Sequence, residues 1–196
     1  MRFVMLALAL ISVNLEFLFT WLALMQRVAP KTVAFGAGLV SAGLVSLAWA
    51  LGQGLELILP AWVVGGSGLV PLVWALHAPQ PAPVSAPAPL PTVAATSPLA
   101  AVIATALVLT ARCQLTLFLP VMAGVSAWTL LGAVGLVGGL TVGLLYSLQG
   151  LARHPALAAT ITARAKASAT TCYVLAGAFV AVDTGLVDQL VKVVSA

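Results

Sequence analysis

Six long apolar stretches dominate the sequence and restrict what the chain can fold into. Each is about 20 residues long with few or no charges, which is the length of one helical crossing of a bilayer. The chain of 196 residues is 62% hydrophobic and only 6% charged, whereas about 25% of the residues of a soluble domain are charged. We therefore predict an all-α integral membrane protein with six transmembrane helices. They are expected at residues 3–26, 33–51, 57–76, 98–122, 128–149 and 170–191.

Basic residues in the loops predict the orientation of these helices. Arg27 and Lys31 lie between the first two spans, and Arg153, Arg164 and Lys166 lie between the last two. Because cytoplasmic loops carry the excess of Lys and Arg, both loops are expected in the cytoplasm. Both termini then lie outside. The basic residues form no continuous run, so we expect membrane lipid and no nucleic acid as a partner.

A stretch rich in Pro and Ala divides the chain into two halves. Residues 77–97 contain no charge, and a helix cannot accommodate prolines so closely spaced. We interpret this stretch as a cytoplasmic linker between a first three-helix half, residues 1–76, and a second, residues 98–196. An odd number of spans in each half means that the second half enters the membrane from the opposite side. The sequence therefore predicts two inverted three-helix repeats.

Polar residues interrupt the first and fourth spans at about the same depth. Asn14 and Glu16 lie halfway along the first span, and the sequence TARCQ occupies residues 110–114 of the fourth. If a two-fold axis in the membrane plane relates the halves, these polar groups approach one another near the midplane. Transporters with inverted repeats place their sites there.

Two interpretations of these residues remain open. In the first, Asn14, Glu16, Cys113 and Gln114 are the ligands of a soft or borderline divalent metal ion. In the second, Glu16 and Arg112 form a structural ion pair that holds the halves together, because an arginine in hydrocarbon requires an opposite charge.

Glycines of the fifth span predict close helix packing. Gly135 and Gly139 are four residues apart, and small residues at this spacing allow helices to approach closely in membranes.

Enzymatic chemistry is not expected. Both histidines, His77 and His154, lie in predicted loops, away from the cysteines, so no Cys/His or Ser/His/Asp set forms at one depth. No glycine-rich phosphate loop follows a strand. We expect no cofactor.

Nearly the whole chain resembles the cadmium-resistance transporter family of the lysine-exporter superfamily. That family has an Asn-x-Asp core in its first span, and VNLEFLFTWLALM supplies Asn14 and Glu16 there. Its glycine-led second span and its third span are similar to FGAGLVSAGLVSLAWALG and ILPAWVVGGSGLVPLVWAL. Its Asn-x-x-Asp-Asn motif, which precedes a proline in the fourth span, corresponds to TARCQLTLFLPVM. Its later loop and sixth span resemble GLARHPALAA and CYVLAGAFVAVD.

The resemblance implies six spans in two three-span halves and a role related to divalent heavy-metal efflux, in a bacterial inner membrane. The site residues differ, since Thr110, Cys113 and Gln114 replace the Asn, Asp and Asn of the motif, with Arg112 among them. Phe17 replaces the second acid of the first span. We therefore expect either a transporter with an altered midmembrane site or a non-transporting subunit that packs against other membrane subunits or a second copy.

Overall fold

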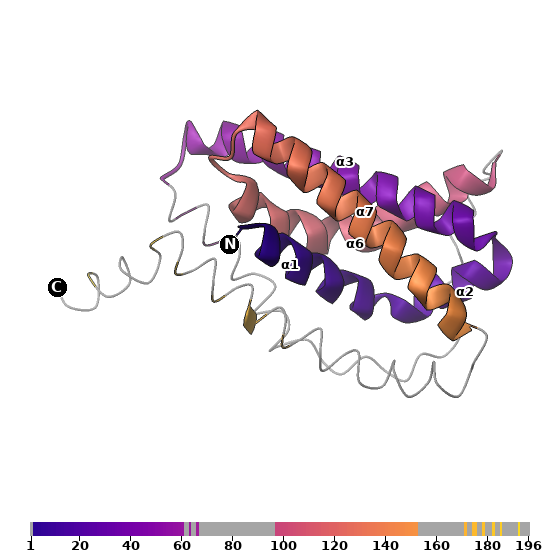
Figure 1. Ribbon diagram of the computed structural model, residues 1–196. Helices are drawn as coiled ribbons and strands as arrows, with labels where there is room; N and C mark the ends of the chain where they lie inside the picture. The colour runs from indigo at the N-terminus through magenta and orange to yellow at the C-terminus, as the bar shows by residue number, and fades with distance from the viewer. Residues whose placement is uncertain are drawn as a thin grey trace.

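The computed structural model describes residues 2–60 and 97–152. Outside these ranges it describes only Val63, Gly66, Thr171, Val174, Leu175, Ala178, Val182, Gly185 and Lys192. Every regular element in the two described ranges is an α-helix, and no strand occurs in them (Figure 1). The helices are α1 (Arg2–Glu16), α2 (Leu18–Arg27), α3 (Pro30–Glu56), α6 (Pro98–Met122) and α7 (Ala127–Ala152).

Three of the predicted spans are confirmed as helices. α6 has the bounds predicted for the fourth span. The helix begins at Pro98 because Ser97 accepts a hydrogen bond from the Ala100 amide at 3.2 Å and Pro98 suits the first helical position. α3 and α7 contain the second and fifth predicted spans and extend beyond them at both ends. All three are long and apolar enough to cross a membrane.

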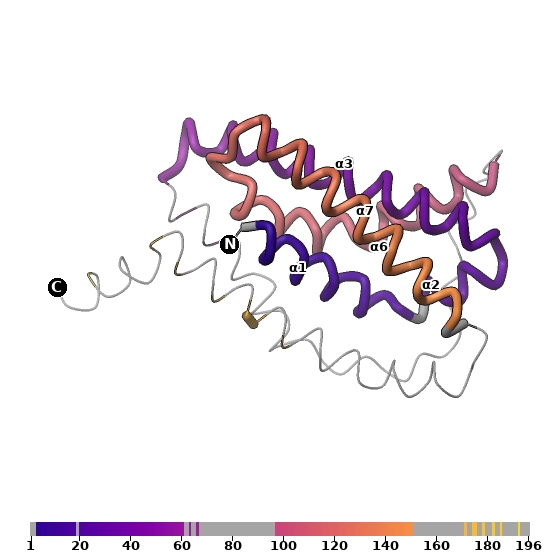
Figure 2. The backbone as a smooth tube through the Cα atoms, in the orientation of Figure 1, coloured from indigo at the N-terminus to yellow at the C-terminus, as the bar shows by residue number. Residues whose placement is uncertain are grey.

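The first predicted span is not one straight helix. It breaks at Phe17 into α1 and α2, and the axes of Phe3–Glu16 and Thr20–Arg27 are bent by 68°. Figure 2 follows the backbone from α1 through α2 into α3. Together α1 and α2 have the composition of one broken span, so the described helices account for up to four crossings.

Other parts of the predicted architecture lie outside the described residues. These are the third span beyond Pro60 apart from Val63 and Gly66, the linker up to residue 96, and most of the sixth span. Six spans and their inverted repeat therefore stay predictions, as does the position of the termini.

α3 packs against both α6 and α7, and glycines allow the close approach. A Cβ atom at Gly36 would lie 2.7 Å from Val102 Cγ1 of α6, and one at Gly38 would lie 2.7 Å from Val142 Cγ2 of α7. A Cβ atom at Gly52 would lie 3.1 Å from the Cα atom of Ala123, just beyond the end of α6. These contacts make α3 parallel to α6 and antiparallel to α7, as the six-span topology predicts for the second, fourth and fifth spans.

The glycines predicted to pack closely are not the ones that do so in the described bundle. Gly135 and Gly139 are exposed, and no described side chain lies within 4 Å of a Cβ atom placed on either. Gly138 instead faces α3, where a Cβ atom placed on it would lie 3.7 Å from the carbonyl oxygen of Gly38. Gly138 thus faces α3, whereas Gly135 and Gly139 lie on another side of α7.

A tight turn connects α6 to α7 and is held by the end of α3. Gly124 has a φ of 62°, a left-handed conformation that suits glycine. The side chains of Trp49 and Gln53 both donate hydrogen bonds to the Val125 carbonyl, at 2.7 and 3.2 Å. These bonds satisfy a backbone acceptor at the turn and fix α3 to the α6–α7 hairpin.

Buried apolar side chains form two main clusters along the bundle. The Phe118 cluster includes Leu10 and Val13 of α1, Val45 of α3 and Val137 of α7. The Trp21 cluster contains the following buried residues of α2, α3, α6 and α7: Trp21, Leu24, Met25, Val33, Ala34, Ala37, Val40, Leu44, Val102, Ala106 and Leu145. Each cluster draws on four helices, so the bundle has an apolar core towards either end.

Candidate functional site

Buried polar side chains occupy the level between the two apolar clusters. On α6, Thr110 and Gln114 lie between Ala106 of the Trp21 cluster and Leu117 of the Phe118 cluster. On α7, Thr141 lies between Val137 and Leu145 in the same way.

The first two spans contribute to the same level. Asn14 follows Val13 of the Phe118 cluster and precedes Trp21, and Ser41 of α3 lies between Val40 and Val45. The polar layer is thus defined by Asn14, Ser41, Thr110, Gln114 and Thr141. Each lies near the middle of its span, so the layer lies at mid-depth if these helices cross a membrane.

Gln114 is the centre of the best-defined contact in the polar layer. Its side chain is 1% exposed, and its Nε2 donates a hydrogen bond to Ser41 Oγ at 3.0 Å. Its Oε1 is buried and accepts no hydrogen bond from any described residue. An acceptor without a partner in a core is costly, and such groups in native proteins call for an explanation.

The remaining members of the polar layer bond within their own helices. Asn14, 2% exposed, donates from Nδ2 to the Leu10 carbonyl at 2.9 Å. The hydroxyls of Thr110 and Thr141 donate to the carbonyls four residues earlier, at 2.9 and 2.8 Å. Such bonds satisfy the hydroxyl hydrogen and leave the hydroxyl oxygen able to accept.

A second pair of predicted residues meets at the edge of the Phe118 cluster, beside the break in the first span. Cys113 Sγ lies 4.0 Å from Glu16 Oε2, which is a weak hydrogen bond from the thiol to the carboxylate. Glu16 is the last residue of α1 and is exposed, while Cys113 is half-buried. This contact joins the predicted first and second halves of the chain.

The four predicted metal ligands therefore fall into two environments. Asn14 and Gln114 are buried in the polar layer, whereas Glu16 and Cys113 meet at its outer side. Helix geometry explains the separation, because successive residues point about 100° apart. Among the described residues, no group of three or more His, Cys, Asp or Glu side chains could hold a metal ion.

The predicted ion pair between Glu16 and Arg112 stays a prediction. Arg112 is exposed on α6, one residue before Cys113, and Glu16 is exposed as well.

The break at Phe17 is the backbone feature that positions this site. Phe17 has φ −96° and ψ 16°, and its amide still donates to the Val13 carbonyl at 3.2 Å. Helix kinks usually occur at Pro or Gly, but neither residue occurs from Phe3 to Arg27. Beyond the bend, α2 packs Trp21 and Leu24 into the Trp21 cluster.

Sequence reasoning missed Ser41 and Thr141. Each is a hydroxyl residue near the middle of a glycine-rich apolar helix, and that position was the available signal, which Ser46 of α3 shares. Their depth matches that of Asn14 and Gln114, which the sequence did single out.

No family model, no curated protein and no solved structure matches this chain.

Proposed function

We propose that this protein is a multi-pass membrane transporter that exports a soft or borderline divalent metal ion, and that Cys113 and Glu16 bind the ion. The observation that supports the proposal is the 4.0 Å separation of Cys113 Sγ and Glu16 Oε2. Thiolate and carboxylate ligands of one tetrahedral zinc ion would be roughly 3.5 Å apart, given bonds of about 2.3 and 2.0 Å. A small side-chain movement is therefore enough for both groups to bind one ion.

Metal binding at this pair would release a proton. The ligand is the thiolate, so Cys113 must lose the hydrogen that it now shares with Glu16. Export of the ion would then be linked to proton uptake when the ion leaves.

The broken first span supports a transport role. Many transporters bind ions where a membrane helix is discontinuous, and the two predicted halves would rock against each other around that point. Glu16 ends α1 at the break, while Cys113 comes from the other half. Arg112, next to Cys113, would act as a tethered cation that pairs with Glu16 when the metal site is empty and moves away when the ion binds.

Metal tolerance of cells that produce the protein tests the proposal. We expect tolerance to Cd²⁺ or Zn²⁺ that is lost in Glu16→Gln and Cys113→Ala, since removing a ligand lowers metal affinity by at least about tenfold. The matched controls are Glu56→Gln, an exposed acid at the end of α3, and Cys172→Ala, the other cysteine. Tolerance in both site variants equal to that of the parent would contradict the proposal.

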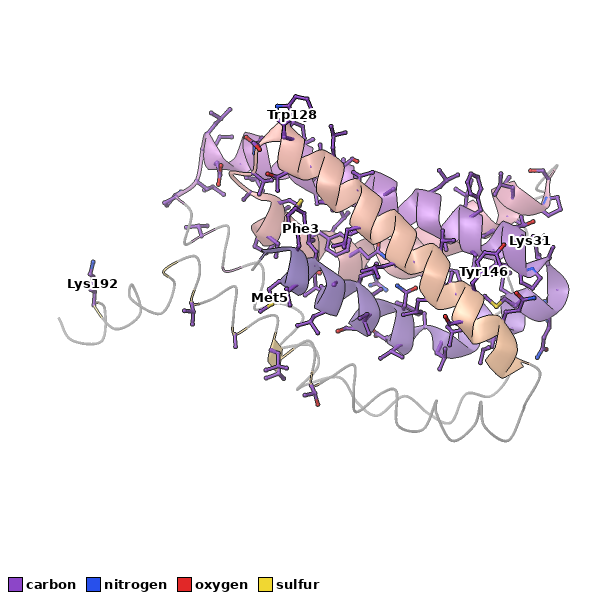
Figure 3. The ribbon with its side chains drawn as sticks, viewed as in Figure 1. Phe3, Met5, Lys31, Trp128, Tyr146 and Lys192 are labelled. Atoms are coloured by element: carbon purple, nitrogen blue, oxygen red, sulfur yellow. The ribbon has the colours of Figure 1, made fainter. Side chains whose placement is uncertain are left out.

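A non-transporting membrane subunit is the second candidate, and the outer face of α7 favours it. Only 22% of the apolar window of α7 is buried, against 56% for α3. Trp128, 83% exposed, projects away from the bundle at the start of α7 (Figure 3). Native gels of gently solubilised membranes distinguish the candidates, because a stoichiometric partner protein is expected only for the subunit.

A further inference from the structure

We propose that the polar layer binds a sodium ion through the carboxamide oxygen of Gln114. This inference goes beyond metal export, because the binding itself does not require Glu16, Cys113 or any transported metal. It rests on the hydrogen bonds and the burial of the layer.

The buried carboxamide oxygen of Gln114 is the atom that lacks a partner among the described residues. The Gln114 side chain is 1% exposed, and Ser41 Oγ accepts a hydrogen bond from Gln114 Nε2. The Ser41 hydroxyl therefore lies on the nitrogen side of the amide, and Oε1 points away from it. No described residue donates to that Oε1. The missing partner must therefore be a hydrogen-bond donor or a cation.

The neighbouring groups of the layer present oxygen lone pairs. Thr110 lies one helical turn before Gln114 on the same face of α6. Its hydroxyl hydrogen is used in the bond to the Ala106 carbonyl, so only acceptor capacity remains at Oγ1. The Thr141 hydroxyl on α7 likewise donates to the Val137 carbonyl, so its Oγ1 also keeps only acceptor capacity.

Packing brings Ser41 and Thr141 to one helix crossing. α3 and α7 are in close contact at Gly38 and Gly138, and Val142 contacts the Gly38 position. Ser41 and Thr141 lie within one turn of this crossing on their helices. Neutral oxygens from α3, α6 and α7 thus gather at one level of the bundle.

The charge and type of these oxygens favour a monovalent ion over a divalent one. The polar layer contains hydroxyl and carboxamide oxygens and no carboxylate, whereas Ca²⁺ sites normally use carboxylates and Mg²⁺ dehydrates reluctantly. α1 ends just after Asn14, and the C-terminal end of a helix carries partial negative charge. Discontinuous membrane helices bind Na⁺ in this way, with half-helix C-terminal ends directed at the ion.

Binding of radioactive sodium to the purified full chain in detergent tests the inference. In choline buffer we expect saturable binding of about one ion per chain, and at least about tenfold weaker binding in Gln114→Leu and Thr141→Val, since bonds to a charged group are lost. Thr105→Val is the matched control. Its hydroxyl is also buried and also donates to the carbonyl four residues earlier, but it lies outside the polar layer. It should bind sodium like the parent.

Two results would overturn the inference. The first is a parent protein that shows no saturable sodium binding, as expected if a water molecule occupies the position beside Gln114. The second is parental sodium affinity in Thr141→Val or Gln114→Leu variants that show a cooperative melting transition. Sodium binding without metal tolerance would refute only the proposed export, and tolerance without sodium binding would refute only the sodium site.

Discussion

The inner and outer sides of α6 differ in composition and in role at the same depth. Gln114 points into the bundle, is almost fully buried and bonds to Ser41 of α3. Cys113, the preceding residue, contacts the exposed Glu16 at the end of α1. Gln114 is enclosed by the bundle, whereas Glu16 is exposed and Cys113 is half-buried at the edge of the Phe118 cluster. Adjacent residues of one motif can therefore serve stability and ligand binding separately.

The strongest prediction concerns the α3–α7 crossing on the inner side. Gly38→Leu should lower the free energy of unfolding by about 3 kcal/mol, because even its Cβ would lie 2.7 Å from Val142 Cγ2 and overpacking forces the helices apart. Thermal or denaturant unfolding in detergent measures the effect. Gly139→Leu, on the exposed side of α7, is the control and should unfold like the parent. If both variants lost the same free energy of unfolding, the packed and exposed sides would not differ in their contribution to stability.

A smaller loss is expected when the partner of Gln114 is removed. Ser41→Ala leaves Gln114 Nε2 without its acceptor in the core, which should cost about 1–3 kcal/mol. In a double-mutant cycle, Gln114→Leu should recover part of that loss, since the buried amide is then absent. Ser46→Ala is the control, because Ser46 bonds only to the Ala42 carbonyl of its own helix. Strictly additive losses would show that the pair does not couple.

The smallest stability effect is expected on the outer side. Cys113→Ala should lower the free energy of unfolding by about 1 kcal/mol or less, because the half-buried Cys113 side chain packs only at the edge of the Phe118 cluster. Its effect on metal tolerance should nevertheless be large. Unfolding curves recorded for the same preparations that are used for metal binding provide the comparison. A loss of several kcal/mol would assign Cys113 to the packing and would weaken its role as a ligand.

Much of the helical frame could be predicted from the sequence. α6 was predicted with its observed bounds from the length of its apolar stretch, and the structure adds the Ser97 cap and Pro98 at its start. The broken first span could not be predicted, because its residues contain no Pro or Gly at the bend. The bend depends on how α2 packs against α3 and α7, which is tertiary information.

The candidate site was predicted in its residue types and only partly in its geometry. The sequence singled out Asn14, Glu16, Cys113 and Gln114. In the structure Asn14 and Gln114 are buried, whereas the exposed Glu16 meets the half-buried Cys113. The rotation of each helix about its axis decides which residues face inward, and uniformly apolar helices give weak signals for that rotation. The same ambiguity explains why the spacing of Gly135 and Gly139 did not reveal the contact that Gly138 makes with α3.

Titration of the purified protein with Cd²⁺, followed by the ultraviolet absorption of the cadmium–thiolate bond, tests the central claim most directly. We expect a saturable signal that is unchanged in Cys172→Ala, weakened in Glu16→Gln and absent in Cys113→Ala. A signal that persists in Cys113→Ala and disappears in Cys172→Ala would contradict the account, because the ion would then be bound without Cys113.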